Sequence, residues 1–531
     1  MNKIPLHIAF VGLLFFLLTR VEAQVQFTQR LEVETDWGDD DFFVLPREGG
    51  MVAFRMKSET PYGRKDKFQY LVSDFQLRSE FSRLVSLDGY YELVGFDLDK
   101  EFLYVLFNKG SQYDSEMAIF EINLENQQLR ELELNSILEM ELQDFLVFNK
   151  QAVFLGKYDF RPVIQIFDIV SQEVITVPGL FEKDARILQM RKDPDLNIFD
   201  VVMSRRDFYK KKIVSVLTFD TNGNKLREVK IDDLGDPSME IVEGLLTSSH
   251  NYKQALIGPY GLRRKEAYQG LYFTRINEFG EYENTFYTVP DFENFYNYLP
   301  EKARERKLKK VERSLNRDKN IPIRNVIVTR EINAADGYYL VYNDLFISSS
   351  SRAIPRDGMY ASNFYRLNPM MGGYGGLFNP LWMDPRFRNT QVSNQYKYLA
   401  AQFILLDAEG KIIWDNTVNL NSDSKAEPIK YGEVSFNGRT LFYMYLDETS
   451  LILSQINDGE LVMENESFEI ELIRENERIA STKENTLQLQ WWYADYYLLS
   501  GKQRIRYQDE DGRVQSRDVN FFTKIKVDDF L

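Results

Sequence analysis

The sequence predicts an all-β protein built from repeated units of about four short strands. The first observation is that runs of apolar, β-branched and aromatic residues alternate with short polar turns along most of the chain. The second is that one stretch, residues 152–180, shows the unit clearly, with a strand that ends in Phe167-Asp168, a polar turn and another strand. The third is that this turn recurs. Its centres lie near Gln76, Asn126, Gln172, Gly223, Gly280, Gly410, Gly459 and Gly512.

The spacing of these turns predicts a β-propeller. Most neighbouring turns lie 46 to 57 residues apart, and the single interval of 130 residues, between Gly280 and Gly410, contains inserted material. Repeats of this length with four strands each are typical of propeller blades. Radial stacking covers both faces of every sheet and leaves only short edges. Eight turns therefore predict eight four-stranded blades. Seven blades is the alternative, because the first and last units are the least regular.

Each unit can be assigned to a stretch of the chain. We expect units one to five at residues 41–87, 90–134, 140–180, 186–231 and 240–289, unit six around the insertions, and units seven and eight at 427–472 and 486–527. Asn222-Gly223, Asp458-Gly459 and Asp511-Gly512 supply the positive φ angles that tight hairpins need. Residues 27–33 alternate in polarity, so we expect them to return to the last unit and close the ring. The alternative is a propeller followed by a separate β-sandwich.

The amino-terminal segment predicts export. Lys3 precedes an apolar run over residues 8–18, and Val21-Glu22-Ala23 has the small residues of a cleavage site. We expect residues 1–23 to be a signal peptide and residues 24–531 to form a single propeller domain. A retained membrane anchor is the alternative. The chain has no cysteine, which favours a bacterial envelope over a eukaryotic secretory route. We therefore expect a periplasmic, outer-membrane-associated or secreted protein.

Charge and composition exclude several kinds of chemistry. The net charge of −16 opposes nucleic acid and anionic lipid as partners of the whole molecule. Histidine occurs only at His7, in the predicted signal, and at His250, in a predicted loop. A Ser-His-Asp triad and a histidine metal site therefore lack their residues. The chain also has no nucleophile elbow and no phosphate-binding glycine loop. We expect no catalytic residues and no cofactor, and lean towards a protein that is not an enzyme.

Two short acidic segments are the candidates for calcium. Asp36 and 39–41 form one acidic run, and residues 220–224, DTNGN, superficially resemble a calcium loop. In the second, the glycine stands at the fourth position and no glutamate follows at the required distance. Turn chemistry explains its Asp and Asn residues without an ion.

The first insertion, residues 291–320, predicts a basic helix. Pro300 suits a helix start, and Leu308, Val311 and Leu315 make a narrow apolar stripe. Between residues 301 and 319 there are nine Lys or Arg against four Asp or Glu. Such a helix is either a solvated element or a contact for an acidic partner or an anionic membrane surface. Its candidate partner-binding residues are Arg304, Lys307 and Lys310.

The second insertion, residues 354–396, is irregular, apolar and rich in glycine. It lacks the period of a helix or a strand, yet it is too apolar for an ordinary loop. Flexible surfaces rich in Met and aromatic residues suit adaptable protein contacts. The alternative is a loop that plugs the channel or covers a blade. The candidate partner-binding residues here are Met370, Met371, Tyr374, Leu377, Phe378, Trp382 and Phe387.

On these repeats the mature chain resembles the β-propeller superfamily over essentially its whole length. The resemblance is one of architecture. Trp414-Asp415 is the only Trp-Asp dipeptide, and the boxes of sialidase and kelch blades are missing. The predicted signal, the absence of cysteine and the Gly/Met/Tyr/Asn-rich segment look like exported envelope proteins of Bacteroidetes-type bacteria. No functional residues are carried over from either likeness.

Our leading hypothesis is a non-catalytic propeller that acts as a protein-interaction scaffold in the bacterial cell envelope, with an envelope protein as its partner. The alternative is a carbohydrate-active enzyme or a glycan-binding propeller. That alternative predicts two inward carboxylates, flanked by exposed Trp or Tyr, at the channel mouth opposite the insertions. A third hypothesis is a propeller stabilised by calcium.

Overall fold

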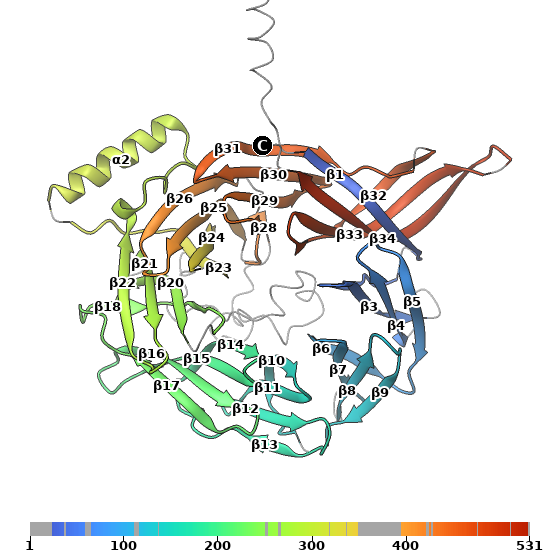
Figure 1. Ribbon diagram of the computed structural model, residues 1–531, viewed down its shortest axis with the longest axis horizontal. Coiled ribbons are helices and arrows are strands. Elements are labelled where there is room, and N and C mark those ends of the chain that lie inside the picture. Colours follow the sequence, from blue (N-terminus) through green and yellow to red (C-terminus); the bar gives the residue numbers. More distant parts are fainter. Residues whose placement is uncertain are drawn as a thin grey trace, which may run out of the picture.

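A computed structural model describes residues 24–36, 39–58, 65–110, 116–135, 137–249, 253–263, 267–317, 319–335, 337–348, 395–420, 424–425, 428–474, 476–509 and 511–528. In this part of the chain, eight antiparallel sheets stand as blades around a central axis (Figure 1). The prediction of an all-β propeller with eight blades is confirmed. The late strands are blades of the same ring and do not form a separate sandwich.

The strands follow the chain from the inner edge of each blade to its outer edge. Blade one contains β2 (Phe43–Arg47), β3 (Gly50–Ser58), β4 (Lys65–Asp74) and β5 (Ser79–Ser86). Blade two contains β6 (Tyr91–Asp99), β7 (Phe102–Lys109), β8 (Glu116–Asn123) and β9 (Leu129–Glu133). Blade three contains β10 (Glu141–Phe148), β11 (Gln151–Tyr158), β12 (Arg161–Asp168) and β13 (Val174–Thr176). Blade four contains β14 (Arg186–Asp193), β15 (Ile198–Arg206), β16 (Lys212–Asp220) and β17 (Lys225–Ile231).

The second half of the ring is less regular. Blade five contains β18 (Met239–Ile241), β19 (Leu245–Leu246), β20 (Gln254–Leu262), β21 (Tyr268–Ile276) and β22 (Tyr282–Thr288). Blade six contains β23 (Val326–Ala335), β24 (Tyr338–Ser348), β25 (Tyr396–Asp407), β26 (Ile412–Asn419) and β27 (Ser424–Lys425). Blade seven contains β28 (Glu433–Phe436), β29 (Thr440–Asp447), β30 (Ser450–Asn457) and β31 (Glu460–Glu469). Blade eight contains β32 (Glu477–Tyr493), β33 (Tyr496–Gln508), β34 (Val514–Asp528) and, as its outer strand, β1 (Gln24–Glu34).

The repeated turn owes its sequence to a side-chain cap. At the end of β12, the Asp168 carboxylate accepts hydrogen bonds from the backbone N–H groups of Val170 and Ser171, both at 2.8 Å. Asp220 does the same for Asn222 at 2.9 Å and Asn224 at 2.8 Å. The side chain thus accepts hydrogen bonds from backbone N–H groups that have no partner strand at the turn. The polar residues of the DTNGN segment therefore serve the turn, as the sequence indicated.

The eighth turn has the predicted chemistry but a different place in its blade. In blades one to seven, the repeated turn joins the third and fourth strands. The Gly512 turn joins β33 to β34, which are the second and third strands of blade eight. Asp509 accepts a hydrogen bond from the Arg513 N–H at 2.7 Å, and Gly512 has a φ of +77°. The same cap and the same left-handed residue therefore recur at a non-equivalent loop.

Strand β1 closes the ring. It pairs antiparallel with β34 from Gln24↔Asp528 to Glu34↔Val519. The prediction that residues 27–33 return to the last unit is therefore confirmed. This pairing joins the first strand of the described chain to the last one.

A buried guanidinium fixes the segment between β1 and β2. The Arg55 side chain is fully buried and donates to Thr35 Oγ1 at 2.8 Å, while its Nη2 lies 3.4 Å from the Asp39 carboxylate. Its guanidinium also lies over the Phe42 ring, 4.4 Å from the centroid. Burial alone would raise the pKa of Asp39, but Lys57, Arg55 and Thr35 outweigh it and lower the pKa.

The acidic run before β2 is thus engaged in ion pairs. Lys57 Nζ lies 3.0 Å from Asp39, and Lys502 Nζ lies 2.9 Å from Asp41. Across the described ranges, no three His, Cys, Asp or Glu side chains gather in a group that could hold a metal ion. Calcium binding stays a prediction for this chain.

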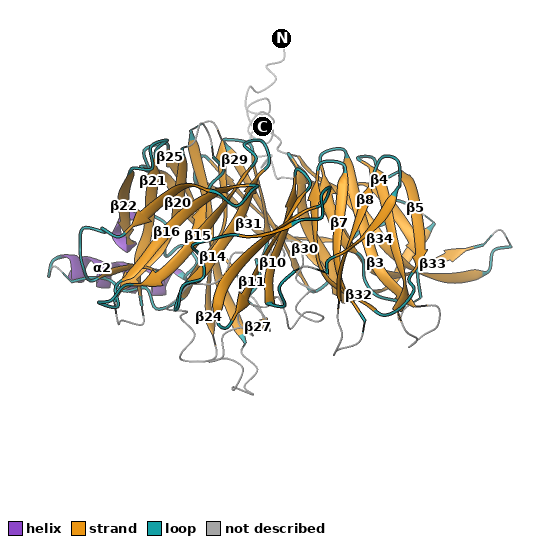
Figure 2. Cartoon of the chain, turned by 90° about the horizontal axis from the view of Figure 1, so that it is seen from below, coloured by secondary structure: helices purple, strands orange, loops and turns teal. Residues whose placement is uncertain are grey.

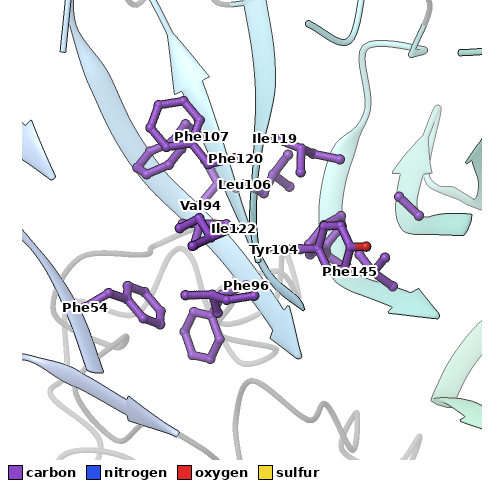
Figure 3. Packing of buried hydrophobic residues seen from close by; sticks show 14 of the residues in the cluster. Phe54, Val94, Phe96, Tyr104, Leu106, Phe107, Ile119, Phe120, Ile122 and Phe145 are labelled. Carbon is purple, nitrogen blue, oxygen red and sulfur yellow. The ribbon is translucent and has the colours of Figure 1, made fainter. Parts of the chain in front are cut away.

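Aromatic side chains fill the spaces between blades. Phe96 of blade two lies edge-on to Phe54 of blade one, with ring centroids 5.1 Å apart (Figure 3). Phe68 of blade one makes a similar contact with Phe107 of blade two at 5.6 Å. Such contacts bury large apolar areas on both faces of each sheet. The core is therefore a series of inter-blade layers around the ring.

The first insertion lies against the outside of blade six. The Asp415 carboxylate of β26 accepts hydrogen bonds from the backbone of Glu293 at 2.8 Å and Asn294 at 3.0 Å. The segment begins with the short helix η1 (Val289–Asp291) and leads to α2 (Glu301–Leu315) at the outer rim of the ring (Figure 1). The predicted helix is thus present, with Pro300 as its N-cap.

The second insertion lies almost entirely outside the described residues. β24 ends at Ser348, and the description resumes at residue 395, just before β25. Among the helices that the structure describes, none is both long and apolar enough to cross a membrane.

We expect Arg55→Ala to destabilise the protein by about 3 kcal/mol or more, because it leaves polar groups at a buried ion pair without their partner. Chemical denaturation followed by tryptophan fluorescence measures the effect. Arg439→Ala is the control, since the Arg439–Asp458 pair is exposed at 57% and 65% and is expected to change stability by at most about 1 kcal/mol. Equal effects of the two substitutions would contradict the assigned role of Arg55.

Candidate interaction surface

The strand order divides the connections between two faces of the ring. The loops between successive blades and those between the second and third strands of a blade lie on one face, which we call the loop face. The turns between first and second strands and those between third and fourth strands lie on the opposite face. The first insertion belongs to the loop-face connection between blades five and six, and β24 and β25, which flank the second insertion, end and begin on the same face. Figure 2 shows the ring from the side, with α2 at its lower left.

Exposed aromatic side chains gather on loop-face connections of blades three and four. Phe208 and Tyr209, between β15 and β16, are 94% and 78% exposed, and Phe160, between β11 and β12, is 79% exposed. Tyr158 and Phe181 are each exposed at close to half of their surface. We call these five residues the aromatic arc. The Phe208 and Tyr209 rings contact each other, with centroids 5.6 Å apart, and clusters of exposed apolar side chains mark interaction sites on folded proteins.

Ion pairs and a cation–π contact connect the loops that carry the aromatic arc. The Arg161 guanidinium lies 4.7 Å from the centroid of the Phe181 ring. The next residue, Glu182, receives two hydrogen bonds from Arg205 Nη1, at 2.9 and 2.7 Å. On the far side, Arg206 Nη1 lies 3.2 Å from the Glu240 carboxylate, which reaches blade five. These contacts hold the loops of three blades together.

The tip that carries Phe208 and Tyr209 is a capped turn. The Asp207 carboxylate accepts a hydrogen bond from the Lys211 N–H at 2.8 Å, and Lys210 has a φ of +60°. Arg263 of blade five donates to the Tyr209 carbonyl oxygen. The backbone is thereby fixed from two sides, and the two rings are left in solvent. A rigid loop that presents aromatic side chains loses little entropy on binding.

A second cluster lies on the inner strands of blades six to eight. Lys430 Nζ lies 2.9 Å from Glu331 of β23 and 2.8 Å from Glu433 of β28. Glu433 also accepts a hydrogen bond from the backbone N–H of Trp491 at 3.3 Å, and the Trp491 side chain is partly exposed. Two carboxylates and an exposed Trp are what the glycosidase alternative predicts. Here, however, an ammonium group contacts both carboxylates.

A single ammonium group is shared by the two carboxylates of this cluster. Burial alone would lower the pKa of Lys430, but the two carboxylates outweigh it and the net pKa is raised. Burial also raises the pKa of Glu433, in spite of the adjacent ammonium group. Lys430 therefore stays protonated and pairs with both acids. The geometry suits a structural ion-pair cluster that ties blade six to blade seven.

The partner-binding residues predicted from the sequence differ in their positions. Arg304 donates to Asn297 Oδ1, in the segment before the helix, at 3.2 Å, whereas Lys307 and Lys310 are exposed. The predicted stripe residue Val311 packs against the core of blades five and six. The other candidates lie outside the described residues, namely Met370, Met371, Tyr374, Leu377, Phe378, Trp382 and Phe387. The partner-binding role of all these residues stays a prediction.

Sequence reasoning missed the aromatic arc. Its signal is present in the RRDFYKKK segment, residues 205–212, where two aromatic residues stand between charged runs and directly follow a turn-capping Asp. In a strand such residues would be buried, but at the tip of a capped turn they are exposed.

Comparison with known proteins identifies no family for this chain. No protein-family model matches the chain, and no curated protein is significantly similar to it. Solved structures with a similar arrangement include the β-propeller domain of the Trilobed protease from Pyrococcus furiosus, at 10% identity and a TM-score of 0.34, covering 80% of this chain and 94% of that one. The polysaccharide lyase Uly1 has 9% identity and a TM-score of 0.39, covering 95% and 100%. The WD40 domain of Toxoplasma gondii coronin has 9% identity and a TM-score of 0.35, covering 96% and 89%.

We expect Lys430→Met to destabilise the protein more at pH 8 than at pH 5. Without the ammonium group, the pKa of Glu433 in the folded state rises further above its value in the unfolded state. The variant therefore keeps its stability while Glu433 is protonated and loses it as the pH rises through the folded-state pKa of Glu433. The difference in melting temperature from the wild type, recorded at both pH values, measures this. Lys430→Met combined with Glu433→Gln should weaken the dependence. An equal decrease in melting temperature at both pH values would contradict the role assigned to Lys430.

Proposed function

We propose that this chain is an exported, non-catalytic β-propeller that binds another protein of the bacterial cell envelope through the aromatic arc. The observation that carries the proposal is the exposure of Phe160, Phe208 and Tyr209 on loops that ion pairs and a cation–π contact connect to their neighbours. Aromatic residues and arginine are enriched in protein interfaces, and aromatic anchors dominate their binding energy. Export is supported by the signal-like residues 1–23 and by the absence of cysteine.

The position of the arc supports a scaffold role. It spans blades three and four and is linked to blade five by Arg206–Glu240. Because each blade packs against its neighbours, these loops keep a fixed spacing. A partner therefore meets a surface that is formed before binding, which favours specific contacts. The ion pairs around the rings resemble the polar rim of a protein interface.

The test is a double substitution, Phe208→Ser with Tyr209→Ser. Removing two exposed anchors should weaken partner binding at least about 30-fold, since a hot-spot residue contributes about 2 kcal/mol or more. The folded stability should be nearly unchanged, because both side chains are already in solvent. Affinity capture from a detergent-solubilised envelope fraction, quantified by mass spectrometry, identifies the partner, and calorimetry with the purified partner gives the affinity.

The matched control is Phe279→Ser. Phe279 is 81% exposed at the turn between β21 and β22, on the face opposite the aromatic arc. This variant should capture the partner as the wild type does. Equal capture by the wild type and the double variant would contradict the proposal. Recovery of a polysaccharide in place of a protein, lost in the double variant, would establish the glycan-binding alternative.

A further inference from the structure

Helix α2 carries a straight row of cations that faces away from the ring. Lys302, Arg306, Lys309 and Arg313 follow one another at intervals of four, three and four residues, which places them on one face of a helix. All four are exposed. Val311, which packs against the core of blades five and six, stands on the opposite face at 3.6 residues per turn. Arg304, which donates to Asn297 in the segment before the helix, stands on that face too. We call the four residues the cationic row.

The cationic row is poorly compensated within the protein. The helix contains seven Lys or Arg and three Glu, in a chain whose net charge is −16. The described part of the chain shows one ion pair on this helix, between Lys309 and Glu305 at 3.9 Å. Neighbouring members of the row repel each other, since like charges four residues apart destabilise a helix. An acidic ligand would remove this repulsion and complement the row.

The orientation of α2 favours an acidic protein over a membrane. A helix that lies on a bilayer inserts its apolar face into the lipid. Here Val311 of the apolar stripe packs against the core of blades five and six. Leu308 and Leu315, which are 47% and 50% exposed, lie on the same side of the helix as Val311 and away from the cationic row. The outward face is cationic and has no large apolar residue. In addition, the strong net negative charge of the whole chain opposes a close approach to an extended anionic surface.

We propose that the cationic row of α2 docks an acidic helical segment of a partner protein. Such a segment would carry Asp or Glu at the same three- and four-residue intervals, so that its carboxylates meet the four cations over about 16 Å of helix. This site lies on a different element from the aromatic arc, and its test does not depend on the arc. A protein bound at both sites would gain affinity by linkage of the two contacts.

The experiment uses the full mature chain and a fluorescent helical peptide with Glu in a matching row. Fluorescence anisotropy should show binding that weakens as salt is raised, because screening reduces exposed charge interactions. The test variant combines Lys302→Gln, Arg306→Gln, Lys309→Gln and Arg313→Gln, since Gln keeps a high helix propensity. It should bind the peptide at least about tenfold more weakly, because exposed ion pairs are weak singly and add along a row. Circular dichroism checks that the fold is retained.

A second variant removes the same charge elsewhere. Lys225→Gln, Lys230→Gln, Lys253→Gln and Arg474→Gln neutralise four exposed cations away from α2. Peptide binding by this control should equal that of the wild type. An equal loss in both variants would overturn the proposal, and so would a wild type that does not bind the peptide. Phosphatidylglycerol vesicles are tested in parallel, and binding to them in place of the peptide, lost in the test variant, would overturn it in favour of a membrane surface.

Discussion

The pairing of β1 with β34 is the constraint on which the rest of this structure depends. Without β1, blade eight would have three strands, and the outer edge of β34 would be open. The register from Gln24↔Asp528 to Glu34↔Val519 instead gives the last blade its fourth strand from the beginning of the chain. Arg55 reinforces the closure, because it fixes the segment that leads from β1 into blade one. A closed ring then sets the distance between any two loops on its faces.

Much of the fold could be predicted because its turns have a chemical signature. Asp168 and Asp220 cap their own turns, and a residue with positive φ follows, so the repeat is visible without any alignment. The same cap does not reveal the position of a turn within its blade, because Asp509 caps the loop between the second and third strands of blade eight. The last unit also begins before residue 486, where the sequence predicts its start. β32 starts at Glu477, in a part of the blade that extends beyond the ring and is exposed on both faces, where alternation is weak (Figure 1).

The candidate site was harder to predict, because exposure depends on the tertiary structure. Composition directed attention to the insertions, whereas the aromatic arc lies on ordinary short turns. Phe160 and Phe208 each follow an Asp in the sequence, and only the ring places their loops on the same face of neighbouring blades. The contacts that hold them, Arg161 with Phe181 and Arg205 with Glu182, join segments that no local pattern relates. For α2 the period predicted the helix correctly, but only the packing of Val311 shows that the cationic row faces outwards.

The two surfaces differ in their chemistry and share one scaffold. The aromatic arc combines exposed rings with paired charges, as protein interfaces do, whereas the cationic row is almost purely electrostatic and acts over a longer range. Both depend on a ring that is closed within one molecule, and closure can be tested directly in a chain that has no cysteine. Gln26→Cys with Lys526→Cys places two thiols at paired positions of β1 and β34. We expect oxidation to give an intramolecular disulfide in high yield, seen as a mobility shift on non-reducing electrophoresis, and none when Gln26→Cys is combined with Asp518→Cys. Failure to cross-link, or cross-links only between molecules, would contradict the account.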